Sequence, residues 1–138
     1  MSGALAPIKV TTTLVTGPTA GAREQSIAAQ LALYPPHAAD PGGTPGAPAS
    51  VAVLLEGLPD GTGTLSPSPS ILIERIAPGC LCCTGNLVLR VTLNRLLRRR
   101  PERLYIGLAT TEHLDQLRSW LQQSPYDQLL ELTPDLHS

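Results

Sequence analysis

Three cysteines stand within four residues of one another, at Cys80, Cys82 and Cys83, directly after Gly79. Thiolates at this spacing can bind one soft or borderline cation together, and zinc is a common guest of such a set. The cluster therefore predicts a metal site, which needs a fourth ligand to become tetrahedral. The candidates for this ligand are His37, His113, His137, a carboxylate, a water molecule and a thiolate of a second chain.

Two other interpretations of the cysteines stay open. A disulfide bond between Cys80 and Cys82, or between two chains, would give them a redox role, whereas a bond between the adjacent Cys82 and Cys83 would be strained. Reduced cysteine is also a small apolar residue suited to a core. Three cysteines crowded into one segment do not form the disulfide framework of a secreted protein, so we expect reduced thiols.

A second chemical pattern occupies residues 17–24, where a predicted strand runs into a predicted helix. Backbone N–H groups and the helix dipole bind phosphate at such places. The full phosphate-binding pattern G-x-x-x-x-G-K-[ST] needs a second glycine, a lysine for the phosphates and a hydroxyl for magnesium. The sequence has Ala22, Arg23 and Glu24 at these three positions, so we do not expect tight binding of a nucleotide with magnesium. The residues favour a purely structural turn between strand and helix, and the alternative is a degenerate nucleotide-binding loop formed by Gly17, Gly21, Arg23 and Glu24.

Strands that alternate with helices must position these motifs. Runs of β-branched and apolar residues predict strands at residues 8–16, 51–55, 71–76, 104–109 and 128–133. Apolar residues at helical spacing predict helices at residues 23–33, 87–99 and 111–122. This alternation indicates an α/β fold with three layers, a mostly parallel sheet between flanking helices.

Length and composition favour a single domain over residues 1–138. Eight of the 14 prolines and six of the 12 glycines lie in residues 35–50 and 57–70, which we predict to be flexible loops. A formal net charge of -1, and arginines without aromatic neighbours for base stacking, argue against a nucleic-acid binder. Because no apolar run is long enough to cross a membrane and no signal peptide is recognisable, we predict a cytoplasmic protein without membrane contact.

The cysteines lie in the segment I-A-P-G-C-L-C-C-T-G-N-L at residues 76–87, between a predicted strand and a predicted helix. In this setting the sequence resembles the CobW-type metal-homeostasis GTPases, whose mark is a G-C-x-C-C motif in a P-loop domain. The resemblance extends from about Val10 to about Thr133 and includes Glu56 and Gly57, where the family has an acidic switch segment. It implies a truncated P-loop NTPase-like fold and a metallochaperone role linked to zinc, or to cobalt and cobalamin, with Cys80, Cys82 and Cys83 as the metal ligands.

The sequence departs from this family at the residues that handle GTP. A glutamate ends the family's Walker B strand, where this sequence has Gly107, and an asparagine precedes G-C-x-C-C, where it has Pro78. Lys9 is the single lysine of the sequence and lies in the first predicted strand, so neither the P-loop lysine nor that of a guanine-specifying N-K-x-D motif is present. The family usually adds a C-terminal domain, so we expect this chain to be a truncated member.

Three functions follow from these observations. The first, which we favour, is a degenerate CobW-like domain that binds zinc or cobalt and serves metal homeostasis as an accessory protein with little or no GTP hydrolysis. The second is an active GTP-binding metallochaperone, in which Arg23 replaces the lysine and a partner protein or second copy completes the site. The third is a protein-interaction domain whose ancestral sites have decayed.

Overall fold

The computed structural model describes residues 9–34, 51–57, 65, 70–76, 87–99, 101–108, 114–123 and 126–137. The predicted metal ligands Cys80, Cys82 and Cys83, together with His37 and His113, lie outside these ranges. The same holds for residues 35–50 and for most of the second stretch rich in proline and glycine.

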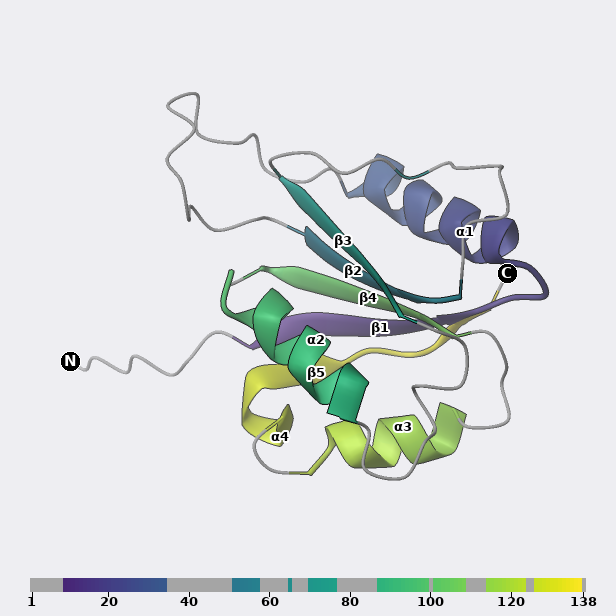
Figure 1. The fold of residues 1–138 in the computed structure, drawn as a ribbon. Coiled ribbons are helices and arrows are strands. Elements are labelled where there is room, and N and C mark those ends of the chain that lie inside the picture. The colour runs from purple at the N-terminus through teal and green to yellow at the C-terminus, as the bar shows by residue number, and fades with distance from the viewer. Residues whose placement is uncertain are drawn as a thin grey trace.

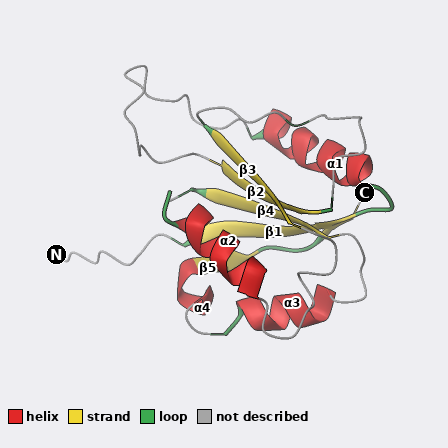
Figure 2. Ribbon diagram, in the orientation of Figure 1, coloured by secondary structure: helices red, strands yellow, loops and turns green. Residues whose placement is uncertain are grey.

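Strands and helices alternate along the chain (Figures 1 and 2). The strands are β1 (Val10–Thr16), β2 (Val51–Glu56), β3 (Ile71–Ile76), β4 (Arg103–Leu108), β5 (Leu130–Leu132) and β6 (Leu136–His137). The helices are α1 (Ala20–Leu33), α2 (Leu87–Leu97), α3 (Leu114–Leu121) and the single turn α4 (Tyr126–Leu129).

The strands form one sheet in the order β3-β2-β4-β1-β5, with β6 beside the end of β1. Every strand pair in the described part of the chain is parallel. The carboxyl ends of β1, β2, β3 and β4 therefore meet at one edge of the sheet, the carboxyl edge. The predicted α/β fold with a parallel sheet is confirmed, and it is consistent with a P-loop-like fold.

Helices cover both faces of this sheet, as Figure 1 shows, and produce the three predicted layers. On one face Ile27 of α1 packs with Val15, Val53 and Tyr105 of the strands. On the other face the buried leucines of α2 and α3 pack against β1, β2 and β4 in the larger cluster. The run Val51–Glu56 is buried along its whole length, as expected for a strand covered on both sides.

Several element boundaries differ from the sequence-based predictions by one to three residues, and two of these differences have a clear local cause. Helix α1 begins at Ala20, three residues earlier than predicted, because Thr19 caps it. The predicted last strand shortens to β5, because Tyr126–Leu129 form a turn of helix before it. None of the helices in the described ranges is long and apolar enough to cross a membrane.

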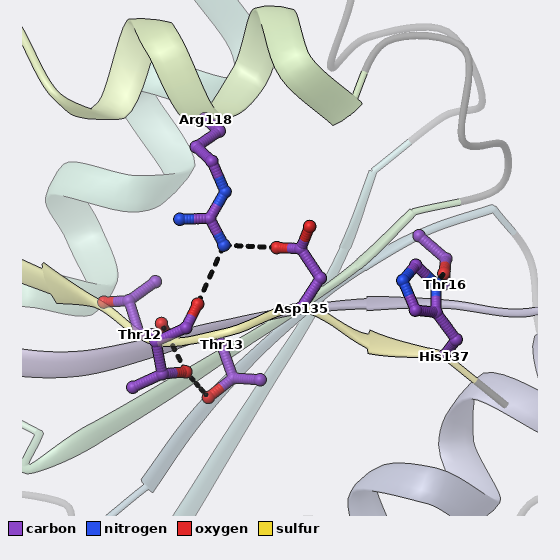
Figure 3. A network of polar contacts seen from close by, with 7 residues as sticks. Thr12, Thr13, Thr16, Arg118, Asp135 and His137 are labelled. Carbon is purple, nitrogen blue, oxygen red and sulfur yellow. Dashed lines mark hydrogen bonds and ion pairs between the residues drawn. The ribbon is translucent and has the colours of Figure 1, made fainter.

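The chain after β5 stays alongside β1 through a short break that ends at β6. Pro134 lies in this break, and proline has no N–H group to give to a strand ladder. Arg118 of α3 fills the break: its guanidinium donates to the Thr133 carbonyl at 2.8 Å and forms an ion pair with Asp135 (Figure 3). These contacts hold β6 beside the last two residues of β1.

Candidate functional site at the carboxyl edge

Parallel α/β sheets generally bind ligands outside the carboxyl ends of their strands. Here three features meet at that edge: the connection from β1 to α1, the end of β2 at Glu56, and the end of β3 at Ile76. From the end of β3 the chain continues into the segment that contains the cysteines. The structure therefore brings the predicted loop to the edge from which the chain continues to the predicted metal ligands.

The connection between β1 and α1 contains three residues, Gly17 to Thr19. The Thr19 side chain accepts a hydrogen bond from the Ala22 N–H at 3.0 Å, so the cap uses one of the N–H groups that a phosphate could otherwise accept from. The predicted loop residues Gly21, Arg23 and Glu24 all lie within the first five residues of the helix, and all three are buried.

Arg23 turns back toward the start of its own loop. Its side chain is 6 % exposed, and Nη1 donates to the Gly17 carbonyl at 2.9 Å. Among the described residues no carboxylate is paired with it. A phosphate that recruited this guanidinium would have to compete with the Gly17 carbonyl. Arg23 thus stabilises the connection between β1 and α1 in the absence of any ligand.

Glu24 forms an ion pair with Arg75 of β3, which lies 51 residues away in the sequence. Arg75 Nη1 and Nη2 each donate to one carboxylate oxygen at 3.3 Å, in the forked arrangement typical of arginine and carboxylate. The Glu24 side chain is 2 % exposed, whereas that of Arg75 is 27 % exposed. The residue at the magnesium-hydroxyl position therefore has both oxygens bonded within the protein and ties α1 to the edge strand β3.

Glu56 places a second buried carboxylate at this edge, at 8 % exposure. It is in register with Ile76 across the β2–β3 pair. The next residue, Gly57, has a φ of 101°, which residues other than glycine rarely adopt, and its N–H donates to the Ile76 carbonyl at 2.8 Å. The last residue of β3 before the cysteine segment thus lies directly beside Glu56. Only the family resemblance pointed to Glu56; a charged residue that ends an apolar strand before glycine is a signal that could have found it.

Gly107, at the position of the family's Walker B glutamate, lies against β2. A Cβ atom there would come within 2.9 Å of Leu55 Cδ2, and Leu55 is itself buried. The space for a side chain at this position is thus already filled from the neighbouring strand. An acidic residue at position 107 would require Leu55 to move.

His137, a candidate fourth metal ligand, lies near the carboxyl end of β1. Its Nδ1 is hydrogen-bonded to Thr16 Oγ1 at 2.6 Å (Figure 3). His137 lies on β6, four strand spacings or about 19 Å from β3, the strand that leads to the cysteine segment. Glu56 lies on β2, one spacing or about 5 Å from Ile76 at the end of β3. Within the described ranges, no group of three or more His, Cys, Asp and Glu residues could hold a metal ion.

Over part of its length the chain shows a weak similarity to a zinc chaperone of the CobW family, which confirms the family resemblance as a partial one. This relative is the zinc chaperone YeiR of Escherichia coli (strain K12), and the two are 33% identical over 75 residues. The matching part makes up 54% of this chain and 23% of YeiR, so the chain spans less than a quarter of that relative. No protein-family model matches the sequence. No solved structure matches it either.

Proposed function

We propose that this chain binds a zinc ion through Cys80, Cys82 and Cys83 and takes part in zinc handling as an accessory protein with little or no GTP hydrolysis. The partial similarity to a zinc chaperone carries the proposal, because that relative handles zinc and this chain retains a dense set of thiol ligands. The similarity favours zinc over cobalt.

The position of Glu56 supports a carboxylate as the fourth ligand. Cys80 follows Ile76 by four residues, and four residues span at most about 14 Å. Glu56 neighbours Ile76 across one strand spacing, so it is within reach of the cysteine segment. His137 is the more remote candidate by three further strand spacings. We therefore include Glu56 in the proposed site in preference to His137.

The contacts of Arg23 and Glu24 support a function without GTP turnover. Each side chain already has a partner inside the protein, the Gly17 carbonyl for Arg23 and Arg75 for Glu24. A carboxylate at the magnesium position would add negative charge next to a polyphosphate instead of a hydroxyl ligand for the metal. Leu55 fills the space beside Gly107, where the family has its Walker B glutamate.

Zinc content tests the proposed site. The protein is purified under reducing conditions with zinc in the medium, and its metal is measured by elemental analysis. We expect stoichiometric zinc in the unmodified protein and a loss of most of it in Cys82→Ser and Cys83→Ser. Glu56→Gln should weaken zinc binding by roughly tenfold. Thr84→Ser, one residue beyond the cluster, is the matched control and should keep its zinc; an unmodified protein free of zinc would end the proposal.

Nucleotide binding is tested separately with a fluorescent GTP analogue, titrated with and without magnesium. We expect no magnesium-dependent binding in the micromolar range by the unmodified protein. The double variant Arg23→Lys, Glu24→Thr restores the lysine and hydroxyl of the full pattern, and Arg98→Lys serves as a control for the added lysine. Magnesium-dependent binding or steady GTP turnover by the unmodified protein would favour the GTPase alternative instead.

A further inference from the structure

A pocket of about 370 Å³ lies on the α1 face of the sheet, and its charged end lies away from the carboxyl edge. It is lined by residues from the end of α1, from strands β1, β4 and β6, and from the segment that joins β5 to β6. The charged end of the pocket is formed by Arg103, the first residue of β4. Leu108, at the carboxyl edge, lies five residues further along the same strand, a distance of about 16 Å. The volume is within the range of small-molecule sites.

Among the described residues that line this pocket, Arg103 is the one that carries a charge. Its Nη1 donates to the Tyr105 hydroxyl at 3.1 Å and its Nη2 donates to the Tyr34 carbonyl, so both acceptors are neutral. Other arginines of the fold are paired with carboxylates: Arg75 with Glu24, Arg95 with Glu74 and Arg118 with Asp135. Arg103 has no carboxylate partner in the described part of the chain, although it is half-buried.

The hydrogen bonds at this end use only some of the donors of Arg103 and Tyr105. A guanidinium has five N–H groups, and two of them account for the contacts with Tyr34 and Tyr105. The Tyr105 hydroxyl accepts from Arg103 and keeps its own proton, for which the described residues offer no hydrogen-bond acceptor. The charged end of the pocket therefore presents several donors and one positive charge.

The threonines at the other end already bond to each other and to the backbone. The Thr133 hydroxyl donates to the Thr12 carbonyl at 3.2 Å, which uses its single proton. The 2.7 Å contact between the hydroxyls of Thr13 and Thr133 therefore has Thr13 as the donor (Figure 3). With these protons committed, Arg103 carries the positive charge that a ligand can meet, and Tyr105, Thr11 and Gln30 add neutral donors to the lining. Leu136 and Pro134 give the pocket an apolar wall.

From this arrangement we infer that the pocket binds a small organic carboxylate with a flat apolar body. The carboxylate accepts hydrogen bonds from the planar fork of Arg103 and from the Tyr105 hydroxyl. The apolar body lies toward Leu136 and Pro134. A single guanidinium balances one negative charge, so the pocket favours a monoanionic carboxylate over a dianionic phosphate ester.

Nuclear magnetic resonance titrations of the whole 138-residue protein test this inference with defined probes. Sodium benzoate supplies the carboxylate, benzamide is its neutral counterpart of nearly the same shape, and phenyl phosphate carries the higher charge. We expect saturable shifts of the amides of Thr11 and Arg103 with benzoate, at a Kd on the order of 1 mM. Benzamide should bind at least about tenfold more weakly, since it lacks the charge.

Two variants separate the pocket from other basic surfaces. Arg103→Gln should weaken benzoate binding by about tenfold or more, while Arg98→Gln, an exposed arginine beyond the end of α2, should leave it unchanged. Tyr105→Phe keeps the buried ring and removes the hydroxyl, and should weaken binding about fivefold. The inference is overturned if benzoate gives no saturable shifts, if benzamide binds equally well, if phenyl phosphate binds more tightly, or if Arg103→Gln and Arg98→Gln behave alike.

Discussion

The ion pair between Glu24 and Arg75 can be measured against a second pair on the same strand. Glu74 of β3 pairs with Arg95 of α2 at 2.7 Å, on the opposite face of the sheet, with side-chain exposures of 33% and 63%. The pair of Glu24 and Arg75 is longer, at 3.3 Å, but its carboxylate is 2% exposed. Distance alone predicts that the Glu74 pair is the stronger, whereas burial predicts that the Glu24 pair is.

We expect burial to dominate. Exposed pairs contribute about 0.2 to 1 kcal/mol, because water screens them and long side chains lose entropy, so the coupling energy of Glu74 and Arg95 should be about 0.5 kcal/mol. Hydrogen bonds to charged groups contribute about 1.5 to 3 kcal/mol. Because Arg75 is 27% exposed, the Glu24 pair should fall near the lower end, at about 2 kcal/mol. Arg75→Gln should cost about 3 kcal/mol, since it leaves a buried carboxylate without its cation.

Two double-mutant cycles measure these coupling energies. One uses Glu24→Gln and Arg75→Gln, the other Glu74→Gln and Arg95→Gln, and urea unfolding at pH 7 gives the free energy of each variant. Raising the salt concentration should reduce the coupling of the exposed pair more than that of the buried pair. Equal couplings in the two cycles, or a larger one for Glu74 and Arg95, would refute the argument from burial.

Two further predictions concern the core. Burial raises the pKa of the Tyr126 hydroxyl above 10.0, and Arg90 has a smaller opposing effect. The folded state therefore holds this proton more tightly than the unfolded state does. Because of this difference, the free energy of unfolding should fall as the pH rises above about 10. Tyr126→Phe removes the 3.0 Å hydrogen bond to Asn94 and should cost about 1 kcal/mol at pH 8 but flatten the alkaline decline in urea unfolding; an unchanged decline would contradict the assignment. Gly107→Ala should cost about 1 kcal/mol in thermal unfolding because its Cβ meets Leu55, and Leu55→Val should recover part of the loss; additive effects would rule out this contact.

Much of the fold could be predicted because its strands carry a local signal. The apolar run of β2 and the β-branched run of β1 each predict a buried strand from a few consecutive residues. The start of α1 was missed although its cap, Thr19, is readable in the sequence. Strand β6 has two residues and exists through its pairing with β1, more than a hundred residues earlier, so no local pattern indicates it.

The candidate site was less predictable, because its contacts join distant parts of the chain. The sequence shows that Glu24 replaces a hydroxyl, but not that Arg75, 51 residues later, neutralises its charge. In the same way, Leu55 of one strand fills the space beside Gly107 of another, and only the strand order makes them neighbours. The residue types at these positions could be identified from the sequence, whereas their partners depend on the register of the sheet.

The ion pair between Glu24 and Arg75 gives the residues that replace the lysine and the hydroxyl of the phosphate-binding pattern a structural context. In the full phosphate-binding pattern the lysine and hydroxyl act on the charges of a nucleotide and a magnesium ion. In this chain Arg23 instead donates to the Gly17 carbonyl, and Glu24 forms an ion pair with Arg75. Replacing Glu24 by threonine would restore the hydroxyl of the pattern and also leave Arg75 without its carboxylate. We therefore expect that rebuilding the pattern at Ala22, Arg23 and Glu24 also requires a change at Arg75 of β3, because the ion pair couples Glu24 to that strand.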